Sequence, residues 1–355
     1  YHMPHALPEQ ELKLAHDLLQ RLQNGSGHTV FSYPRLMADT PNLPSPLLHG
    51  LNPYVPLPVP IQFRETLERR EEVYTLPPKA YESIKGGSAL LANQAKCPFR
   101  AFAAHRLHPE KPLETTLGFN PMERGQLMHQ LLERLWQALK SHNVLSNYDA
   151  AALDRFIDEI IEQTLKPYLQ DHTHAYPPLV QDVERLRLKN LIKANLDWER
   201  SRPPFTVHAL EKSYQITLAG LELTIRVDRI DTTGADQWII DYKTTLPAHK
   251  PWHEERPEEP QLLLYALLDE RINALLFAEL QSVGLTISGF SADKLPIKGV
   301  STLKKGEQWH EKRQHWHREL TLLAEEFQNG YCEPIPKRKA ICQQCEFQNL
   351  CRIAL

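Results

Sequence analysis

Hydrophobic and polar residues alternate in the first part of residues 223–245, whose sequence is LTIRVDRIDTTGADQWIIDYKTT. Single polar residues separate Leu223, Ile225 and Val227, and a second run at residues 238–243 follows a short polar turn at residues 234–237. This period of two predicts two β-strands joined by a turn. The predicted fold is organised around this pair because further strand and helix patterns lie on both sides of it.

Helical periodicity is clearest at residues 120–139. Asn120 suits an N-cap, Pro121 suits the first helical position, and Glu123 completes a capping box. One face carries an apolar stripe of Leu127, Leu131, Leu132, Leu135, Trp136 and Leu139. Similar patterns predict helices at residues 9–23, 88–107, 149–169, 178–200, 259–270 and 306–329. The charged faces of 149–169 and 178–200 are typical of solvated surface.

Further strand patterns cover residues 28–33, 207–218, 274–282 and 285–291. The last two are predicted to pair in antiparallel fashion at the edge of the sheet. The whole pattern indicates a mixed α/β fold, in which a central mixed β-sheet is flanked by helices. Prolines recur through residues 41–60, which is typical of an extended linker.

The predicted helix at residues 88–107 has two local features. Ser88 follows two glycines and is a plausible N-cap. Pro98 predicts a break near Cys97, because proline cannot complete the hydrogen-bond ladder inside a helix. We expect this break to turn the Cys97 thiol outward, toward a partner.

The charge of the chain is nearly balanced, with 41 Lys and Arg against 44 Asp and Glu. A nucleic-acid contact would therefore depend on local basic patches. Candidates are Lys304-Lys305, Lys312-Arg313 and Lys337-Arg338-Lys339. No apolar run approaches the roughly 20 residues of a membrane span, and no signal peptide is visible. We expect a cytoplasmic protein with no membrane partner.

Asp241 and Lys243 stand two positions apart on a predicted strand, so their side chains share one face of the sheet. Asp228 adds a carboxylate from the neighbouring strand. A hard divalent cation binds carboxylates of this kind, and the lysine can then orient a water or stabilise charge on a phosphoryl oxygen. The competing interpretation is a solvated surface ion pair, the commoner role of such a pattern on an exposed hairpin.

Five cysteines occur, with Cys97 far upstream of Cys332, Cys342, Cys345 and Cys351. In a cytosolic chain this spacing suggests metal or cluster ligands rather than disulfides. Four thiolates suit either tetrahedral zinc or a 4Fe-4S cluster, and the residues alone do not choose between them.

Seven short motifs occur in order along the chain. They are Cys97-Pro98-Phe99-Arg100, Gly125-x-x-x-His129, Glu211, Asp228-Arg229-Ile230-Asp231, Asp241-Tyr242-Lys243, Gln261-x-x-x-Tyr265, and Cys342-x-x-Cys345-x5-Cys351. In this set and order the chain resembles the PD-(D/E)XK nuclease superfamily, in the RecB/AddB-like branch that carries an iron-sulfur cluster. The resemblance implies a restriction-endonuclease-like core with an added helical layer. It also implies a cysteine-ligated cluster that joins the N- and C-terminal parts.

The resemblance implies a metal site. His129, Asp228 and Asp241 would ligate Mg²⁺ or Mn²⁺, and the backbone carbonyl of Tyr242 would add a further oxygen. The alternative for His129 is a structural role, which is the commoner role of a lone histidine on such a helix.

Catalytic roles follow from the same resemblance. Lys243 would position the attacking water and stabilise the developing charge. Glu211 would lie at the edge of the site and hold a second ion or a metal-bound water. Gln261 and Tyr265 would steady Lys243 or contact the DNA backbone.

The resemblance favours a 4Fe-4S cluster over zinc as the occupant of the cysteine site. Cys97, Cys342, Cys345 and Cys351 would be its ligands, and a metal-free group of structural thiols is the third interpretation. Cys332 is left over as a buried or free thiol.

These expectations describe a metal-dependent DNA nuclease that hydrolyses phosphodiester bonds on single strands or DNA ends in recombinational repair. The alternative is a catalytically inactive DNA-binding or scaffold subunit that retains the fold. The presence of His129, Asp228, Asp241 and Lys243 together favours the active enzyme.

Two parts of the chain are predicted. Residues 86–355 would form the nuclease domain, and residues 1–85 would hold a helix, a short strand and the proline-rich linker. Residues 30–48 resemble the end of the helicase-like part to which such nucleases are fused. Tyr1-His2-Met3 is typical of a cloning scar, which indicates an excised piece of a longer protein. The expected partners are DNA and a helicase-like region or subunit.

Overall fold

The structure is a computed structural model. It describes residues 7–37, 39–54, 75–78, 84, 86–109, 118–171, 176–281 and 284–352. The chain divides into two compact units, Tyr1–Arg70 and Glu71–Leu355. The predicted domain boundary at residues 85 and 86 stays a prediction, because much of the chain around it lies outside the described residues.

The first unit contains α1 (Pro8–Asn24), β1 (Leu36–Met37), β2 (Thr40–Pro41) and the short helix η1 (Pro46–Leu48). The helix predicted at residues 9–23 is confirmed, and none of its residues is buried. The strand predicted at residues 28–33 is wrong. Residues 28–33 form no strand. At the start of this segment the Ser26 hydroxyl donates to the His28 backbone carbonyl, and the Thr29 hydroxyl donates to the backbone carbonyl of Leu22, near the end of α1. Residues 55–60 of the proline-rich stretch lie outside the described part.

The second unit is built on a six-stranded mixed sheet. Its strands, in spatial order, are β3 (Thr206–Leu218), β4 (Leu221–Thr233), β5 (Asp236–Lys243), β6 (Ile272–Gln281), β7 (Gly284–Ser291) and β8 (Val300–Thr302). The β5–β6 and β7–β8 pairs are parallel and the other pairs antiparallel. The predicted mixed sheet is therefore confirmed. The edge position predicted for the β6–β7 pair is wrong, because β5 pairs with β6 on one side and β8 pairs with β7 on the other.

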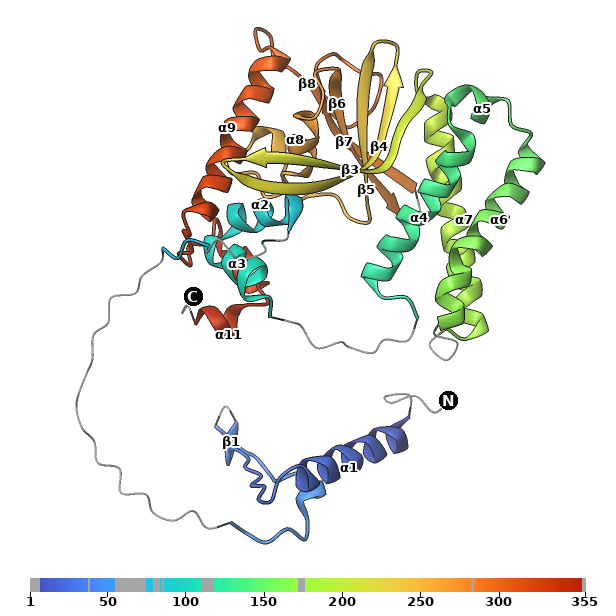
Figure 1. The fold of residues 1–355 in the computed structure, drawn as a ribbon. Helices are drawn as coiled ribbons and strands as arrows, with labels where there is room; N and C mark the ends of the chain where they lie inside the picture. The colour runs from blue at the N-terminus through green and yellow to red at the C-terminus, as the bar shows by residue number, and fades with distance from the viewer. Residues whose placement is uncertain are drawn as a thin grey trace. The chain divides into compact units, whose positions relative to one another are not determined.

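Helices cover both faces of this sheet (Figure 1). One face packs on α4 (Pro121–Leu139), α5 (His142–Ser146), α6 (Ala150–Asp171) and α7 (Pro178–Ser201), which form the helical layer. The other face packs on α2 (Gly87–Lys96), α8 (Gln261–Ala266) and α9 (Trp309–Gln328). The alternation of β5 explains this arrangement, since Ile240 and Tyr242 enter the first core while Ile239 enters the second.

Two helix predictions need correction. The helix α2 begins at Gly87 after Gly86, so Ser88 lies in its first turn and does not cap it. The expected break at Cys97 is present, followed by α3 (Pro98–Phe102) and the π-helix η2 (Ala103–Leu107). The helix predicted at residues 259–270 is shortened to the six residues of α8. Pro260 stands directly before α8, and a proline disfavours helical backbone geometry in the residue that precedes it, which here is Glu259.

The C-terminal part holds η3 (Pro251–His253) and, after α9, the short helices α10 (Lys339–Gln343) and α11 (Gln348–Cys351). Within the described residues, every helix is too short or too polar to cross a membrane.

A buried ion network lies between the sheet and α7, where plain solvated surface was expected. Glu199 of α7 accepts from Arg229 at 2.7 Å and from Arg202 at 2.6 Å. Asp231 lies 2.7 Å from Arg229 and 2.8 Å from Arg202. All four side chains are fully buried, and the Arg229 guanidinium lies 3.8 Å from the ring centroid of Trp136. The expectation of a solvated face is therefore wrong for this part of α7.

Candidate active site

The register of β3, β4 and β5 brings three acidic side chains into one row. Glu211 of β3 lies opposite Asp228 of β4. Asp241 of β5 lies on the other side of Asp228, one position beyond the last paired residues of β4 and β5. The row faces away from the ion network, because Asp228 and Asp241 alternate with Arg229 and Tyr242 along their strands.

The backbone is irregular where this row forms. Glu211 has φ of 45°, in the left-handed region that side chains with a Cβ rarely adopt. On β4, Val227 and Ile230 enter the same hydrophobic core although their positions differ in parity, so the strand changes its buried face between them. Such irregular geometry recurs next to functional sites, where it re-aims side chains.

His129 reaches the acidic row from α4. This helix begins with the predicted capping box, in which Asn120 accepts from the Glu123 backbone and Glu123 accepts from the Asn120 backbone. The apolar stripe of α4 is buried in the first core, which fixes the direction of His129. Its Nδ1 lies 3.3 Å from Glu211 Oε1 and 3.5 Å from Asp228 Oδ2.

Burial and like charge shift the pKa values of this cluster. Burial, followed by the charge of Asp241, raises the pKa of Asp228 to about 8. Burial also raises the pKa of Asp241, although the ammonium of Lys243 opposes that shift. Burial alone would lower the pKa of His129, yet the hydrogen bond to Glu211 and the nearby carboxylates outweigh it and raise the pKa. Burial therefore makes the ionised forms of Asp228 and Asp241 costly unless a cation stabilises them.

Lys243 is held in place by a chain of contacts that crosses to α8. Its Nζ lies 2.8 Å from Asp241 Oδ2 and donates to Gln261 Oε1 at 2.7 Å. The Gln261 side-chain amide donates to the Tyr265 hydroxyl at 2.6 Å, and that hydroxyl donates to the backbone carbonyl of Arg226. The sequence predicted this set, and the structure brings all four of these side chains together.

The donor set fits a hard divalent cation. One ligand atom each from His129, Glu211 and Asp228 lie within 4.8 Å of one another, the one such group among the described residues. Asp241 lies outside that group, but it is fully buried and neither of its carboxylate oxygens has a properly directed hydrogen bond. Carboxylate oxygens are the hard ligands that Mg²⁺ and Mn²⁺ prefer, and a bound cation would stabilise the ionised form of these buried groups. Glu211, expected only at the edge, thus lies inside the group.

Two residues near the site were missed by sequence reasoning. Arg226 binds Glu211 through Nε at 2.7 Å, and the period of two on its strand, which places it on the face of Asp228, was a usable signal. The charge of Glu259 raises the pKa values of both Asp241 and Lys243. Its only sequence signal was its position two residues before Gln261.

The four predicted cysteine ligands line one cavity of about 250 Å³, together with Phe99, Arg100, Pro334, Ile341 and Gln348. Cys97 is buried and faces the other three, so the expectation of an outward thiol is wrong. Burial and the neighbouring thiols raise the pKa values of Cys97 and Cys342. Cys332 is buried and does not line this cavity.

The spacing of the thiols bears on what they could hold. Around tetrahedral zinc, with Zn–S near 2.3 Å, the sulfurs lie about 3.8 Å apart. Among the described residues, no three cysteine sulfurs lie within 4.8 Å of one another. In any three of these sulfurs at least one pair is therefore more widely separated than around tetrahedral zinc.

Among the comparisons with known proteins, the family profile is the informative one. A family profile described as the PD-(D/E)XK nuclease superfamily matches residues 91–352. A solved structure titled "Crystal structure of SSO0001" is similar, with 14% sequence identity over 75% of this chain and 96% of that one, and a TM-score of 0.27. No curated protein matches the chain.

Proposed function

Because the chain belongs to the PD-(D/E)XK nuclease superfamily, we propose that it is a metal-dependent deoxyribonuclease that hydrolyses phosphodiester bonds. The members of this superfamily are in general hydrolytic nucleases, and the nuclease fold implies a DNA substrate. The observation that carries the proposal is the row of Glu211, Asp228 and Asp241 with Lys243 beside it. Phosphodiester hydrolysis needs this combination of anionic ligands and a fixed cation.

Each side chain of the row has a proposed task. Bound Mg²⁺ or Mn²⁺, held by His129, Glu211, Asp228 and Asp241, would supply charge neutralisation and a more acidic water. The backbone carbonyl of Tyr242, next to Asp241, is the further oxygen proposed for the same ion.

Lys243 has a separate task. Its ammonium carries three protons, of which one is donated to Gln261 while Asp241 lies beside the group. A proton remains for an oxygen of the scissile phosphate. Gln261 and Tyr265 keep the ammonium aimed at that point through their own hydrogen bond.

We assign the chain to the RecB/AddB-like branch with a 4Fe-4S cluster held by Cys97, Cys342, Cys345 and Cys351. The single shared cavity and the spacing of its thiols support this assignment over zinc. A cluster there would join segments 342 − 97 = 245 positions apart. Anaerobically purified protein should be brown with about four irons per chain, and one zinc without iron would contradict the assignment.

The proposed setting is recombinational repair, with single strands or DNA ends as substrates and a helicase-like region or subunit as partner. The alternative, a catalytically inactive scaffold, is disfavoured because the ligand row and Lys243 are complete. A buried cluster of uncompensated carboxylates is costly for a protein that makes no use of it.

A cleavage assay separates the two. End-labelled single-stranded and double-stranded DNA is incubated with Mg²⁺ or Mn²⁺, with EDTA as the metal-free control and Lys243→Ala as the matched protein control. The proposal expects cleavage by the wild type that both controls remove. DNA binding without cleavage under any metal would leave the inactive scaffold as the function.

A further inference from the structure

The segment that leads into α8 determines where Gln261 lies. We call residues 254–261 the anchor segment. Three of its four glutamates, Glu254, Glu258 and Glu259, bind cations, and it ends at Gln261, which accepts the hydrogen bond from Lys243. Because Gln261 is the first residue of α8, any displacement of the anchor segment moves the partner of Lys243 directly.

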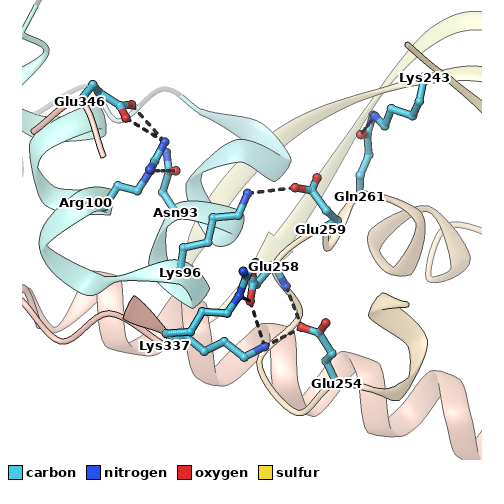
Figure 2. Close-up of polar contacts among 11 residues, drawn as sticks. Asn93, Lys96, Arg100, Lys243, Glu254, Glu258, Glu259, Gln261, Lys337 and Glu346 are labelled. Carbon is cyan, nitrogen blue, oxygen red and sulfur yellow. Dashed lines mark hydrogen bonds and ion pairs between the residues drawn. The ribbon is translucent and has the colours of Figure 1, made fainter. Parts of the chain in front are cut away.

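Cations from two distant parts of the chain bind these glutamates (Figure 2). Arg338 donates to Glu258 through two parallel hydrogen bonds of 2.9 and 2.6 Å. Lys337 lies 2.6 Å from Glu254, and Lys96 lies 2.9 Å from Glu259. A bidentate arginine–carboxylate pair fixes orientation as well as distance.

The arginine pair is the firmest of these contacts. Glu258 is almost fully buried, at 5% exposure, and its hydrogen bond with Arg338 is the main cause that lowers its pKa. The carboxylate is therefore ionised at neutral pH and is neutralised mainly by Arg338, with the Lys337 ammonium farther away at 3.7 Å. Removing one partner of such a pair leaves a buried charge uncompensated.

The same cations belong to the segments that carry the cysteines. Lys96 immediately precedes Cys97, and Lys337 and Arg338 precede Cys342 by a few residues. The Lys337 backbone N–H donates to the Lys96 carbonyl at 2.9 Å, which joins the two segments. Arg100 adds a link at 3.1 Å to Glu346, which lies between Cys345 and Cys351. The anchor segment is thus fastened to the walls of the cysteine cavity.

We propose that Arg338 and Lys96 are positioning residues for Lys243, and that they act through Glu258, Glu259 and Gln261. Their contacts make the ordering of the cysteine-bearing segments a condition for the correct placement of the catalytic ammonium. This inference deepens the proposed nuclease function and rests on it. Neither cation touches the reacting groups, so their effect reaches the chemistry only through the anchor segment.

The first test measures backbone mobility and needs no activity. Arg338→Gln removes the bidentate pair. Arg271→Gln is the matched control, because it removes an arginine–carboxylate pair at 2.7 Å with Asp269, just beyond α8 and exposed. By hydrogen–deuterium exchange on protein as purified, Arg338→Gln should raise uptake at least several-fold in residues 254–266 and leave the sheet unchanged. Reciprocally, Glu258→Gln should raise uptake in residues 337–345, since coupling acts in both directions.

The second test measures catalysis. Arg338→Gln should lower kcat about 10-fold or more, since a misplacement of about 1 Å can cost 10²-fold, while KM for DNA changes less than about twofold. Arg271→Gln should leave both constants unchanged. In a double-mutant cycle, Arg338→Gln with Glu258→Gln should cost little more than either change alone, because both break one contact.

The outcomes separate this inference from the function it rests on. If Arg338→Gln and Arg271→Gln give the same exchange in residues 254–266, or if kcat is unchanged, the positioning role is refuted even when the wild type cleaves DNA. If the wild type cleaves nothing, the nuclease proposal fails while the exchange data still decide whether Arg338 orders the anchor segment. A uniform rise in exchange across the sheet would signal general unfolding and would also refute the positioning role.

Discussion

Two buried clusters of charge meet at strand β4, one around Arg229 and Asp231 and the other around Asp228, and they are built differently. On the face toward α7, Glu199 and Asp231 are matched by Arg202 and Arg229, and the pairs are 2.6 to 2.8 Å apart. On the other face, Glu211, Asp228 and Asp241 have only the partly exposed His129, Lys243 and Arg226 nearby. In the first cluster every cation is as buried as its carboxylate, whereas in the second the carboxylates are buried and their cations are partly exposed.

The difference separates a structural role from a chemical one. A balanced, buried network needs nothing from solvent, and its removal should be felt in folding. In the carboxylate row, burial raises the pKa values of Asp228 and Asp241, which is typical of a site that gains a cation. Mutations in the two clusters should therefore change different quantities: stability on one face and cleavage or metal binding on the other.

The largest expected effect is the loss of cleavage in Lys243→Ala. Removal of one preorganised charge donor typically costs 10²- to 10³-fold in rate, so we expect about 10³-fold or a complete loss. Folding should be retained, because the Lys243 side chain is 27% exposed and belongs to neither hydrophobic core. Rates on labelled DNA and a melting curve measure the two quantities, with the exposed Lys294→Ala as control. Cleavage at the wild-type rate would place the chemistry elsewhere.

Next in size is the destabilisation of Arg229→Met on the balanced face. This change leaves Glu199 and Asp231 with Arg202 alone, and breaking a buried pair costs about 3–5 kcal/mol in the free energy of unfolding. Arg226→Met is the control on the same strand. Its guanidinium is 61% exposed, so it should cost less than about 1 kcal/mol. Urea unfolding in EDTA measures both, and equal costs would erase the distinction between the faces.

Much of the strand arrangement could be predicted from local pattern. The first part of strand β4 carries a clear period of two, strand β5 carries a short apolar run, and the capping box marks the start of α4. The failures occur where distant residues decide the outcome. The charged face of α7 reads as solvated, since nothing local shows that Arg229 will bind Glu199 from 30 positions away. The short strand β8 is missed because its three residues are too few for a periodic signal.

The candidate site shows the same division. The side-by-side placement of Asp241 and Lys243 follows from strand alternation, and Gln261 and Tyr265 follow from their helical spacing. Their meeting with Lys243 depends on how α8 packs on β5, which no local pattern contains. The position of Glu211 inside the metal-ligand group depends on the β3–β4 register and on its left-handed backbone.

A smaller effect is expected for His129→Ala. One ligand is lost from a site whose carboxylates remain, so the Mg²⁺ concentration for half-maximal cleavage should rise roughly 10- to 100-fold while kcat at saturating metal changes less. Mn²⁺ should support the wild type at least as well as Mg²⁺, because it accepts imidazole more readily. Metal titrations of cleavage rate measure this, with the exposed His310→Ala of α9 as control. If the Mg²⁺ concentration for half-maximal cleavage is unchanged in His129→Ala, His129 has a structural role and is not a metal ligand.

The smallest expected effect is a pH dependence of the metal-free fold that originates in Asp228. Its pKa is 3.8 ordinarily and about 8 in the fold, so between these values the folded state binds the proton that the unfolded state has lost. Stability from this group is complete below about pH 4 and is lost as the pH rises through about 8. His129, whose pKa is also raised, contributes with the same sign.

Melting temperatures in EDTA from pH 5 to pH 9 measure this loss, and Asp228→Asn is the control that removes the titrating carboxyl. One proton limits the slope to about 1.4 kcal/mol per pH unit, or about 3 °C in a unit of this size. The wild type should therefore lose stability more steeply than Asp228→Asn as the pH rises. Saturating Mg²⁺ should flatten the wild-type curve, because a bound cation stabilises the ionised carboxylate and so removes the advantage of the proton. The network around Arg229 predicts no such metal dependence, since its charges are already matched. If melting temperature falls equally with pH in the wild type and in Asp228→Asn, the pKa of Asp228 is not raised in the fold and the prediction is wrong.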